Sequence, residues 1–176
     1  MGAENQKVGE FISKQKIDNR VRELAAKINQ DFAGQEIILV GVLSGSFIFL
    51  ADLMREIKIP VQVEFVSISS YEGTNSTGQI SFRLDVKQSL ENKNIIVVED
   101  IVDTGLTITF LLKHLKLKQP KSLKLCSLLL KKARLKVDVS VDYLGFDIED
   151  KFVIGYGLDF DGHYRELPYI GVYGGV

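Results

Sequence analysis

Carboxylates and a turn suited to an anion follow one another between Glu99 and Thr107. Glu99 and Asp100 come directly after a run of apolar residues, and Asp103 begins a tight turn. Carboxylates beside a phosphate would repel it unless they bind sugar hydroxyls, a metal ion or a proton. The combination therefore predicts a ribose phosphate with magnesium. The residues placed to hold the phosphate, at a predicted helix N-terminus, are Thr104, Gly105, Leu106 and Thr107.

A strand and a helix must position these groups. Ile95 to Val98 is a run of β-branched residues, too short for a helix, which predicts a buried central strand that stops at Glu99. From Thr107 an amphipathic helix is expected, with its apolar face at Ile108, Leu111, Leu112 and Leu115. In an open α/β sheet, ligands bind beyond the carboxyl ends of the strands. The polar residues between strand and helix stand at such an end.

Other strand and helix units precede this one. A stripe of apolar residues predicts a helix over Lys16–Phe32 that Gly34 ends, followed by a strand over Ile37–Leu43. Ser44, Gly45 and Ser46 then lead into a second helix. Its predicted inward residues are Phe47, Leu50, Leu53, Met54 and Ile57. A third strand, Val61–Ile68, runs into a polar tract that ends at Gln79, and a tract of this length inside a domain is usually functional or disordered.

A further buried strand is predicted over Ser122–Leu130, and Lys131 and Lys132 follow it. Short β segments at 143–146 and 152–155 come next. The aromatic, Gly, Asp and Arg residues after them indicate a small cap over the strand ends. Together these patterns predict an α/β protein with a mostly parallel twisted sheet flanked by helices and a small C-terminal hood.

Length and composition favour one soluble globular domain. The chain has 176 residues, of which 45% are hydrophobic and 26% charged. We expect a single domain over 1–176, with its core at about 16–140 and the hood at about 141–176, possibly joined by N-terminal residues. The one cysteine, Cys126, lies in an apolar run and is expected in the core. No signal peptide or membrane span is recognisable, so we expect a cytoplasmic protein without membrane contact.

Positive charge is concentrated between Lys113 and Lys136, which holds nine Lys or Arg residues and no acid. Such asymmetry indicates either a nucleic-acid face or a site for anionic substrates. Aromatic residues do not interleave with this charge, as stacking on a single strand would require. We therefore expect no specific nucleic-acid partner, although an RNA-binding regulator stays the alternative.

The string E-D-I-V-D-T-G-L-T closely resembles the 5-phosphoribosyl pyrophosphate (PRPP) signature of type I phosphoribosyltransferases. An ordinary strand-to-helix turn with solvated acids is the alternative. Further along, K-F-V-I-G-Y-G-L-D-F and R-E-L-P-Y-I-G resemble the hypoxanthine-guanine branch of that family. The resemblance covers most of the chain from about Val40.

The resemblance implies a role for each site residue. It assigns Leu43, Ser44, Gly45 and Arg165 to pyrophosphate, and a flexible loop over the site to Ser70 and Tyr71. A hairpin position for Tyr71 is the alternative. Lys131 would donate to the purine 6-oxo group, Phe152 would stack on the base, the Val153 backbone would read its edge, and Asp159 would lie near base and metal.

The implied reaction transfers the phosphoribosyl group of PRPP to N9 of hypoxanthine or guanine in purine salvage, giving IMP or GMP and pyrophosphate. Asp103 would be the base at purine N7, and Mg²⁺ would be the cofactor, with Glu99, Asp100 and Asp159 as its candidate ligands. A homodimer or homotetramer is expected. A xanthine-preferring enzyme shares every motif, so the preferred purine stays open. Ser44 departs from the family, where a basic residue is common at this position.

Overall fold

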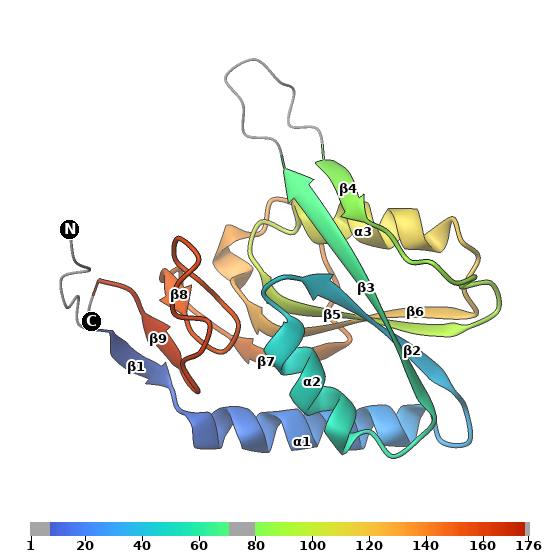
Figure 1. The fold of residues 1–176 in the computed structure, drawn as a ribbon, viewed down its shortest axis with the longest axis horizontal. Coiled ribbons are helices and arrows are strands. Elements are labelled where there is room, and N and C mark those ends of the chain that lie inside the picture. The colour runs from blue at the N-terminus through green and yellow to red at the C-terminus, as the bar shows by residue number, and fades with distance from the viewer. Residues whose placement is uncertain (1–7, 71–79, 175–176) are drawn as a thin grey trace.

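Six strands form the main sheet, in the order β4-β3-β2-β5-β6-β7 (Figure 1). The computed structural model describes residues 8–70 and 80–174. All neighbouring strands run parallel except β4, which is antiparallel to β3. The strands of this sheet are β2 (Ile37–Leu43), β3 (Val61–Ser70), β4 (Ile80–Leu84), β5 (Asn94–Val102), β6 (Ser122–Leu130) and β7 (Tyr143–Asp147). The mostly parallel sheet predicted from the sequence is confirmed.

Helices cover both faces of this sheet. Helices α1 (Lys14–Asp31) and α2 (Phe47–Glu56) pack on one face, and α3 (Leu106–Lys116) packs on the other. Figure 1 shows α1 and α3 on opposite sides of the central strands. Residues of β2 and β5 alternate between the two cores, so these strands are buried on both faces and read as continuous apolar runs. None of the helices in the described part of the chain is long and apolar enough to cross a membrane.

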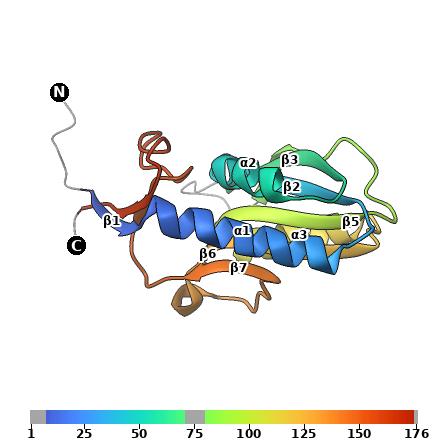
Figure 2. The ribbon, with the colours of Figure 1, turned by 90° about the horizontal axis from the view of Figure 1, so that it is seen from below.

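A second sheet joins the two ends of the chain. Its order is β1-β9-β8, formed by β1 (Gly9–Ile12), β9 (Ile170–Val172) and β8 (Val153–Ile154), and all its pairings are antiparallel. Figure 2 shows it beside the N-terminal end of α1. The hood is therefore built from C-terminal residues together with an N-terminal strand.

Several elements differ in detail from the sequence predictions. Helix α1 begins at Lys14 because the Ser13 hydroxyl accepts from the N–H of Lys16 at 3.4 Å and caps the helix. Strand β5 was expected to stop at Glu99 but continues to Val102, since β6 pairs with it along this length. Strand β4 was not predicted, because Ile80–Leu84 follows a polar tract and offers only one short alternation of apolar and polar residues.

Two predictions for α2 were wrong. Phe47 and Met54 are 43% and 38% exposed, whereas Phe49, which the predicted stripe omitted, is fully buried. This helix carries apolar residues on nearly every side, so its sequence does not mark which side faces the sheet. The predicted burial of the α1 stripe and of Cys126 is confirmed.

Candidate active site

The carboxyl end of β5 carries two adjacent carboxylates. Glu99 is only 8% exposed, and Asp100 beside it is partly buried. Burial, and then the negative charge of Asp100, raise the pKa of Glu99 well above its ordinary value. Burial likewise raises the pKa of Asp100, and the nearby Arg165 guanidinium opposes that shift. The pair therefore favours a bound proton or cation.

A short loop connects this pair to α3. Gly105 forms the N-cap of α3 with φ +80°, a conformation that glycine adopts without strain. The N–H groups of Thr107 and Ile108 find no acceptor within residues 8–70 and 80–174. A cavity of about 100 Å³ opens here, lined by Glu99, Ile101, Val102, Asp103, Thr104, Gly105, Thr107 and Ile108. Unpaired N–H groups at a helix N-terminus can bind an anion in such a cavity.

The loop between β2 and α2 lies directly against Asp100. A Cβ built on Gly45 would overlap the Asp100 carboxylate and would lie 2.5 Å from its Cγ. On its other side the Gly45 carbonyl contacts Gly157, where a Cβ would also overlap it. Glycine at both positions allows the loop to lie this close to the Asp100 side chain on one side and to the Gly157 backbone on the other. Leu43 is partly buried and Ser44 is exposed at the start of the same loop.

The Arg165 side chain is held at this junction from two directions. Its Nη1 donates to the Gly157 carbonyl, and its Nη2 lies 2.8 Å from Asp159 Oδ1. The segment that carries these residues is anchored by Tyr156, whose hydroxyl donates to Asp52 of α2 at 2.7 Å. Burial and then this hydrogen bond raise the pKa of the tyrosine above its ordinary range. The structure thus brings Arg165 and Asp159 close to Gly45 and Asp100.

The other side of the β5 loop faces the end of β6. Lys131 is 8% exposed, and its Nζ lies 3.2 Å from Asp150 Oδ1. Arg134 follows in a short 3₁₀ helix, η1 (Lys132–Arg134), and its Nε lies 2.6 Å from Asp103 Oδ1. That oxygen is buried and, within the described residues, has no hydrogen bond, so its contact with Arg134 is ionic. Lys131 and Asp103 therefore face one region of the site.

An aromatic group lies at the outer rim. Phe152 is 53% exposed and immediately precedes β8, to which the buried Val153 belongs. The Phe152 ring meets Phe160 edge to face, with centroids 5.7 Å apart, and Tyr173 with centroids 5.9 Å apart. An exposed ring held in this way offers a flat apolar surface to a planar ligand.

The chemistry of Glu99 and Asp100 fits Mg²⁺. Among residues 8–70 and 80–174, no group of three or more His, Cys, Asp or Glu side chains could hold a metal ion. Mg²⁺ in enzyme sites is usually bound by one or two carboxylates, with substrate phosphates and water completing its shell. The two neighbouring carboxylates match that pattern in type and number. Asp159 is turned to Arg165 and to the Gly162 N–H.

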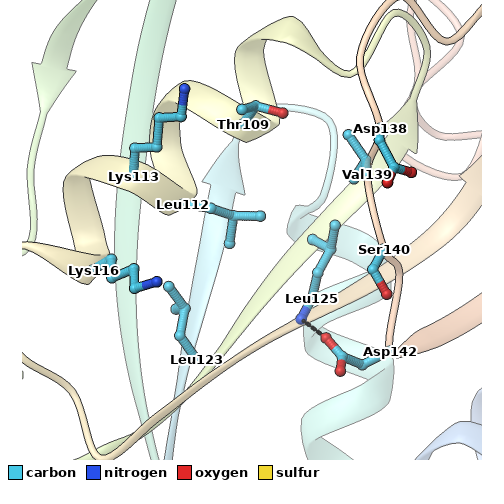
Figure 3. Close-up of a pocket in the computed structure, with 10 residues that line it drawn as sticks. All are labelled: Thr109, Leu112, Lys113, Lys116, Leu123, Leu125, Asp138, Val139, Ser140 and Asp142. Carbon is cyan, nitrogen blue, oxygen red and sulfur yellow. Dashed lines mark hydrogen bonds between the residues drawn. The ribbon is translucent and has the colours of Figure 1, made fainter.

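A larger hollow, of about 400 Å³, lies between α3, β6 and residues 138–142 (Figure 3). Leucines form much of its wall, and its Asp142 accepts from the N–H of Leu125 at 2.9 Å. The residues that line it come from the far side of α3 and the first half of β6. This hollow contains none of the predicted site residues.

Some site residues were missed, and one predicted pair lies partly outside the structure. Arg134 and Asp150 carry no recognisable pattern, and only their nearness to Lys131 and Phe152 in the sequence could have pointed to them; Gly157 lies within the string K-F-V-I-G-Y-G-L-D-F but received no role. Ser70 ends β3, which was expected to stop at Ile68, and pairs with Ile80 of β4. Tyr71 lies outside the described residues.

Comparisons with known proteins point to one family. The model of the phosphoribosyl transferase domain matches residues 8–161. A hypoxanthine-guanine phosphoribosyltransferase of Dictyostelium discoideum is 48% identical over 166 residues, with 92% of each chain covered. A hypoxanthine phosphoribosyltransferase of Escherichia coli is 41% identical over 164 residues, again with 92% of each covered. A crystal structure of a hypoxanthine-guanine phosphoribosyltransferase from Bacillus anthracis superposes with a TM-score of 0.90 at 45% identity, covering 94% of this chain and 99% of that one.

Proposed function

The chain belongs to the phosphoribosyl transferase domain family, and from this premise we propose that it is a purine salvage enzyme. It transfers the 5-phosphoribosyl group of PRPP to N9 of a 6-oxopurine, hypoxanthine or guanine, and releases pyrophosphate. The bond between the ribosyl carbon and the pyrophosphate oxygen breaks, a bond to N9 forms, and the purine loses a proton. The protein must therefore stabilise a leaving anion, hold the ribose phosphate and accept that proton.

Pyrophosphate binds where the loop after β2 meets Arg165. The guanidinium compensates the charge that develops on the leaving group. Ser44 and Gly45 offer backbone N–H groups, and Leu43 begins the same loop. This role is supported by the close approach of Gly45 to Asp100 and by the short distance from Arg165 to Gly157 and Asp159. Because Ser44 supplies no positive charge, Arg165 carries a larger share of the neutralisation.

The 5-phosphate of the ribose binds at the N-terminus of α3, at Thr104, Gly105, Leu106 and Thr107. Glu99 and Asp100 would hold the ribose hydroxyls and the Mg²⁺ ion, and Asp159 is a further candidate ligand for the metal. When bound, the ion supplies positive charge to the pyrophosphate oxygens. These roles are supported by the two adjacent carboxylates at the end of β5, because burial raises the pKa of each and a bound cation would compensate their charge.

The purine lies between Phe152 and the end of β6. Phe152 stacks on the ring, the Val153 backbone lies at its edge, and Lys131 donates to the 6-oxo oxygen. Asp103 accepts the proton from N7, a step that typically contributes about 10² to 10⁴ in rate. This role is supported by Asp103 Oδ1, which is buried and, among the described residues, has no hydrogen bond and an ionic contact with Arg134 Nε at 2.6 Å. Ser70 and Tyr71 belong to a loop that closes over the reacting groups and excludes water.

The observation that carries this proposal is the convergence of Gly45, Asp100 and Arg165 from three distant parts of the chain. The test is a steady-state assay with PRPP and Mg²⁺ in which hypoxanthine, guanine and xanthine are offered in turn and pyrophosphate release is measured. Turnover with hypoxanthine or guanine is expected. Turnover with xanthine alone would identify a xanthine-preferring enzyme, and none with any purine would refute the proposal.

The RNA-binding alternative is weakened by the ion pairs within the basic stretch. Four of its side chains already have acidic partners, the pairs being Lys118–Asp85, Lys124–Asp142, Lys131–Asp150 and Arg134–Asp103. Any RNA affinity is then weak, non-specific and strongly dependent on salt. Tight binding to one RNA sequence at physiological salt, without transferase activity, would favour the RNA-binding function over the transferase function.

We further propose a cytoplasmic homodimer or homotetramer. Phe47 and Met54 of α2 and Phe65 of β3 each expose more than a third of their surface, at 43%, 38% and 38%. Large exposed apolar side chains of this kind are candidates for burial against a second copy. Sedimentation equilibrium would reveal the state, and a monomer at micromolar concentration would contradict this assignment.

A further inference from the structure

Four charged side chains form a continuous row beside the proposed purine site. Lys131 Nζ lies 3.2 Å from Asp150 Oδ1, and Arg134 Nη1 lies 3.0 Å from Asp150 Oδ2. Arg134 Nε in turn lies 2.6 Å from Asp103 Oδ1. The row therefore runs from Lys131 through Asp150 and Arg134 to Asp103. Its charges alternate in sign, and its two ends are the residues proposed to contact the purine.

Each inner member of the row is shared between two partners. Asp150 accepts from Lys131 and, through both of its oxygens, from Arg134. These hydrogen bonds, first that of Arg134 and then that of Lys131, hold the pKa of Asp150 below its ordinary value. Arg134 presents Nε to Asp103 and Nη1 to Asp150, two donors that its planar guanidinium holds at a fixed angle. A single flexible ammonium group has no such fixed pair of directions.

The backbone around the row is also linked to the site. The Lys131 N–H donates to the Val102 carbonyl at 2.9 Å, and the Lys136 N–H donates to the Thr104 carbonyl at 2.9 Å. Residues 131–136 therefore bond to the loop that carries Asp103. Asp150 stands two residues before Phe152 on the connection between β7 and β8. The row thus joins three separate segments of the proposed purine site.

We propose that Asp150 and Arg134 are positioning residues for purine recognition. Asp150 holds the Lys131 ammonium through one of its three N–H groups and leaves the others free for the 6-oxo oxygen. Arg134 holds the Asp103 carboxylate where it meets the N7 proton. One chain of ion pairs then places both Lys131, the donor to the 6-oxo oxygen, and Asp103, the acceptor of the N7 proton. This inference rests on the proposed function, because it concerns the residues that select the purine.

The exposure of the row differs between its middle and its ends. Arg134 and Asp150 are themselves about half exposed, at 44% and 49% of their side chains, and exposed pairs usually contribute little. The two ends of the row are more enclosed at the atoms that matter, because the Lys131 side chain is 9% exposed and the Asp103 Oδ1 atom is buried, although the Asp103 side chain as a whole is 41% exposed. Small shifts of a partner therefore move the Lys131 ammonium and the buried oxygen of Asp103. The row acts on geometry at the site more than on stability.

The first test replaces Asp150 with Asn and measures steady-state kinetics. With Asp150→Asn we expect KM for hypoxanthine at saturating PRPP to rise about five- to tenfold, less than for loss of the Lys131 donor itself because the ammonium group is kept and only its partner is changed, while KM for PRPP changes by less than about twofold. Asp150→Glu keeps the carboxylate and should recover most of the affinity. The matched control is Asp142→Asn, which breaks the 2.8 Å pair with Lys124 at the other end of β6 and should leave both constants unchanged.

The second test uses Arg134, and it stands even where Asp150→Asn fails to fold. Arg134→Gln should lower kcat about tenfold, because Asp103, the proposed base, loses the guanidinium that holds it. Arg134→Lys should recover little of this loss, since an ammonium group cannot bridge the carboxylates of Asp103 and Asp150 at once. In Arg134→Gln/Asp150→Asn, the loss in kcat/KM should be smaller than the product of the single losses, because both residues act through one row.

The outcomes separate this inference from the proposed function. If the unmodified protein transfers the phosphoribosyl group to no purine, the proposed function fails. If it is active but Asp150→Asn behaves like Asp142→Asn, or raises KM for PRPP as much as KM for the base, the positioning role of Asp150 is refuted. Full recovery by Arg134→Lys, or independent losses in the double variant, would overturn the shared row.

Discussion

Gly45→Ala should uncouple the pyrophosphate loop from the carboxylates of β5. The new methyl carbon would overlap the Asp100 carboxylate and would lie 2.5 Å from Asp100 Cγ, whereas ordinary contacts begin at 3.4 Å. Gly157 closes the other side of the loop, so the methyl group cannot be accommodated by a shift in that direction. Because a carboxylate oxygen of Asp100 lies closer still than Cγ, either the loop or Asp100 must move by more than about 0.9 Å, the difference between the two Cγ distances.

The size of that displacement sets the expected loss. A misplacement of about 1 Å at a reacting centre can cost about 10²-fold in rate. We expect kcat/KM for PRPP to fall by about that factor, with a smaller change in KM for the purine, because the proposed purine site lies between Phe152 and the end of β6 and does not include Gly45. Gly45 has no positive φ, so alanine adds no backbone strain there. The fold should persist, as circular dichroism and thermal unfolding would check.

Gly34→Ala is the matched control. Gly34 has φ +72° and no atom within 4 Å of the position that a Cβ would occupy, so alanine brings backbone strain without overlap. We expect this variant to lose about 1 to 2 kcal/mol of stability while keeping its kinetic constants. Unchanged kcat/KM for PRPP in Gly45→Ala, in a protein that binds Mg²⁺ and PRPP normally, would refute the placement of pyrophosphate at this loop.

Three further predictions concern single side chains. Asp103→Asn keeps the shape of the side chain but loses the proton acceptor, so kcat should fall about 10² to 10⁴-fold with PRPP binding retained; near wild-type kcat would remove Asp103 from the role of base. Lys131→Ala should lower kcat/KM for the purine about 10- to 150-fold and relax discrimination against 6-aminopurine. In Lys132→Ala, which removes an exposed charge, kcat/KM for the purine should stay within about twofold of the unmodified protein. Equal effects of the two substitutions would show that Lys131 contributes only to the general positive charge of this region. Because the pKa of Glu99 is raised on folding, the metal-free protein should lose stability as pH rises through the folded-state pKa. Glu99→Gln should reduce this loss, as measured by thermal unfolding between pH 5 and 8. The same dependence of stability on pH in both proteins would contradict the raised pKa of Glu99.

Much of the fold was predictable because its patterns are local. The apolar runs of β2 and β6 match their strands at both ends, and the α1 stripe is buried as the helical period predicts. Patterns of this kind fail where they are short or ambiguous. Helix α2 is apolar on too many sides to show its inner face, and β1 and β9 are short strands that only their pairing stabilises.

The site divides in the same way. Glu99, Asp100, Asp103 and the turn to α3 are neighbours in the chain, so their common chemistry could be recognised from the sequence alone. The contact of Gly45 with Asp100, and the reach of Arg165 to Gly157, join segments that are far apart in the sequence. Strand order and the path of the C-terminal segment decide which of these meet, and local residue patterns specify neither.

The row through Arg134 and Asp150 shows this most clearly. Neither residue belongs to a recognisable pattern, and each follows or precedes a site residue that the sequence did indicate. They meet because β6 pairs with both β5 and β7, which brings the connections after these strands to one edge of the sheet. The sequence indicated which groups could perform the chemistry, and the tertiary structure decided which charges lie against them, because ion pairs across connections form only after the strands are paired.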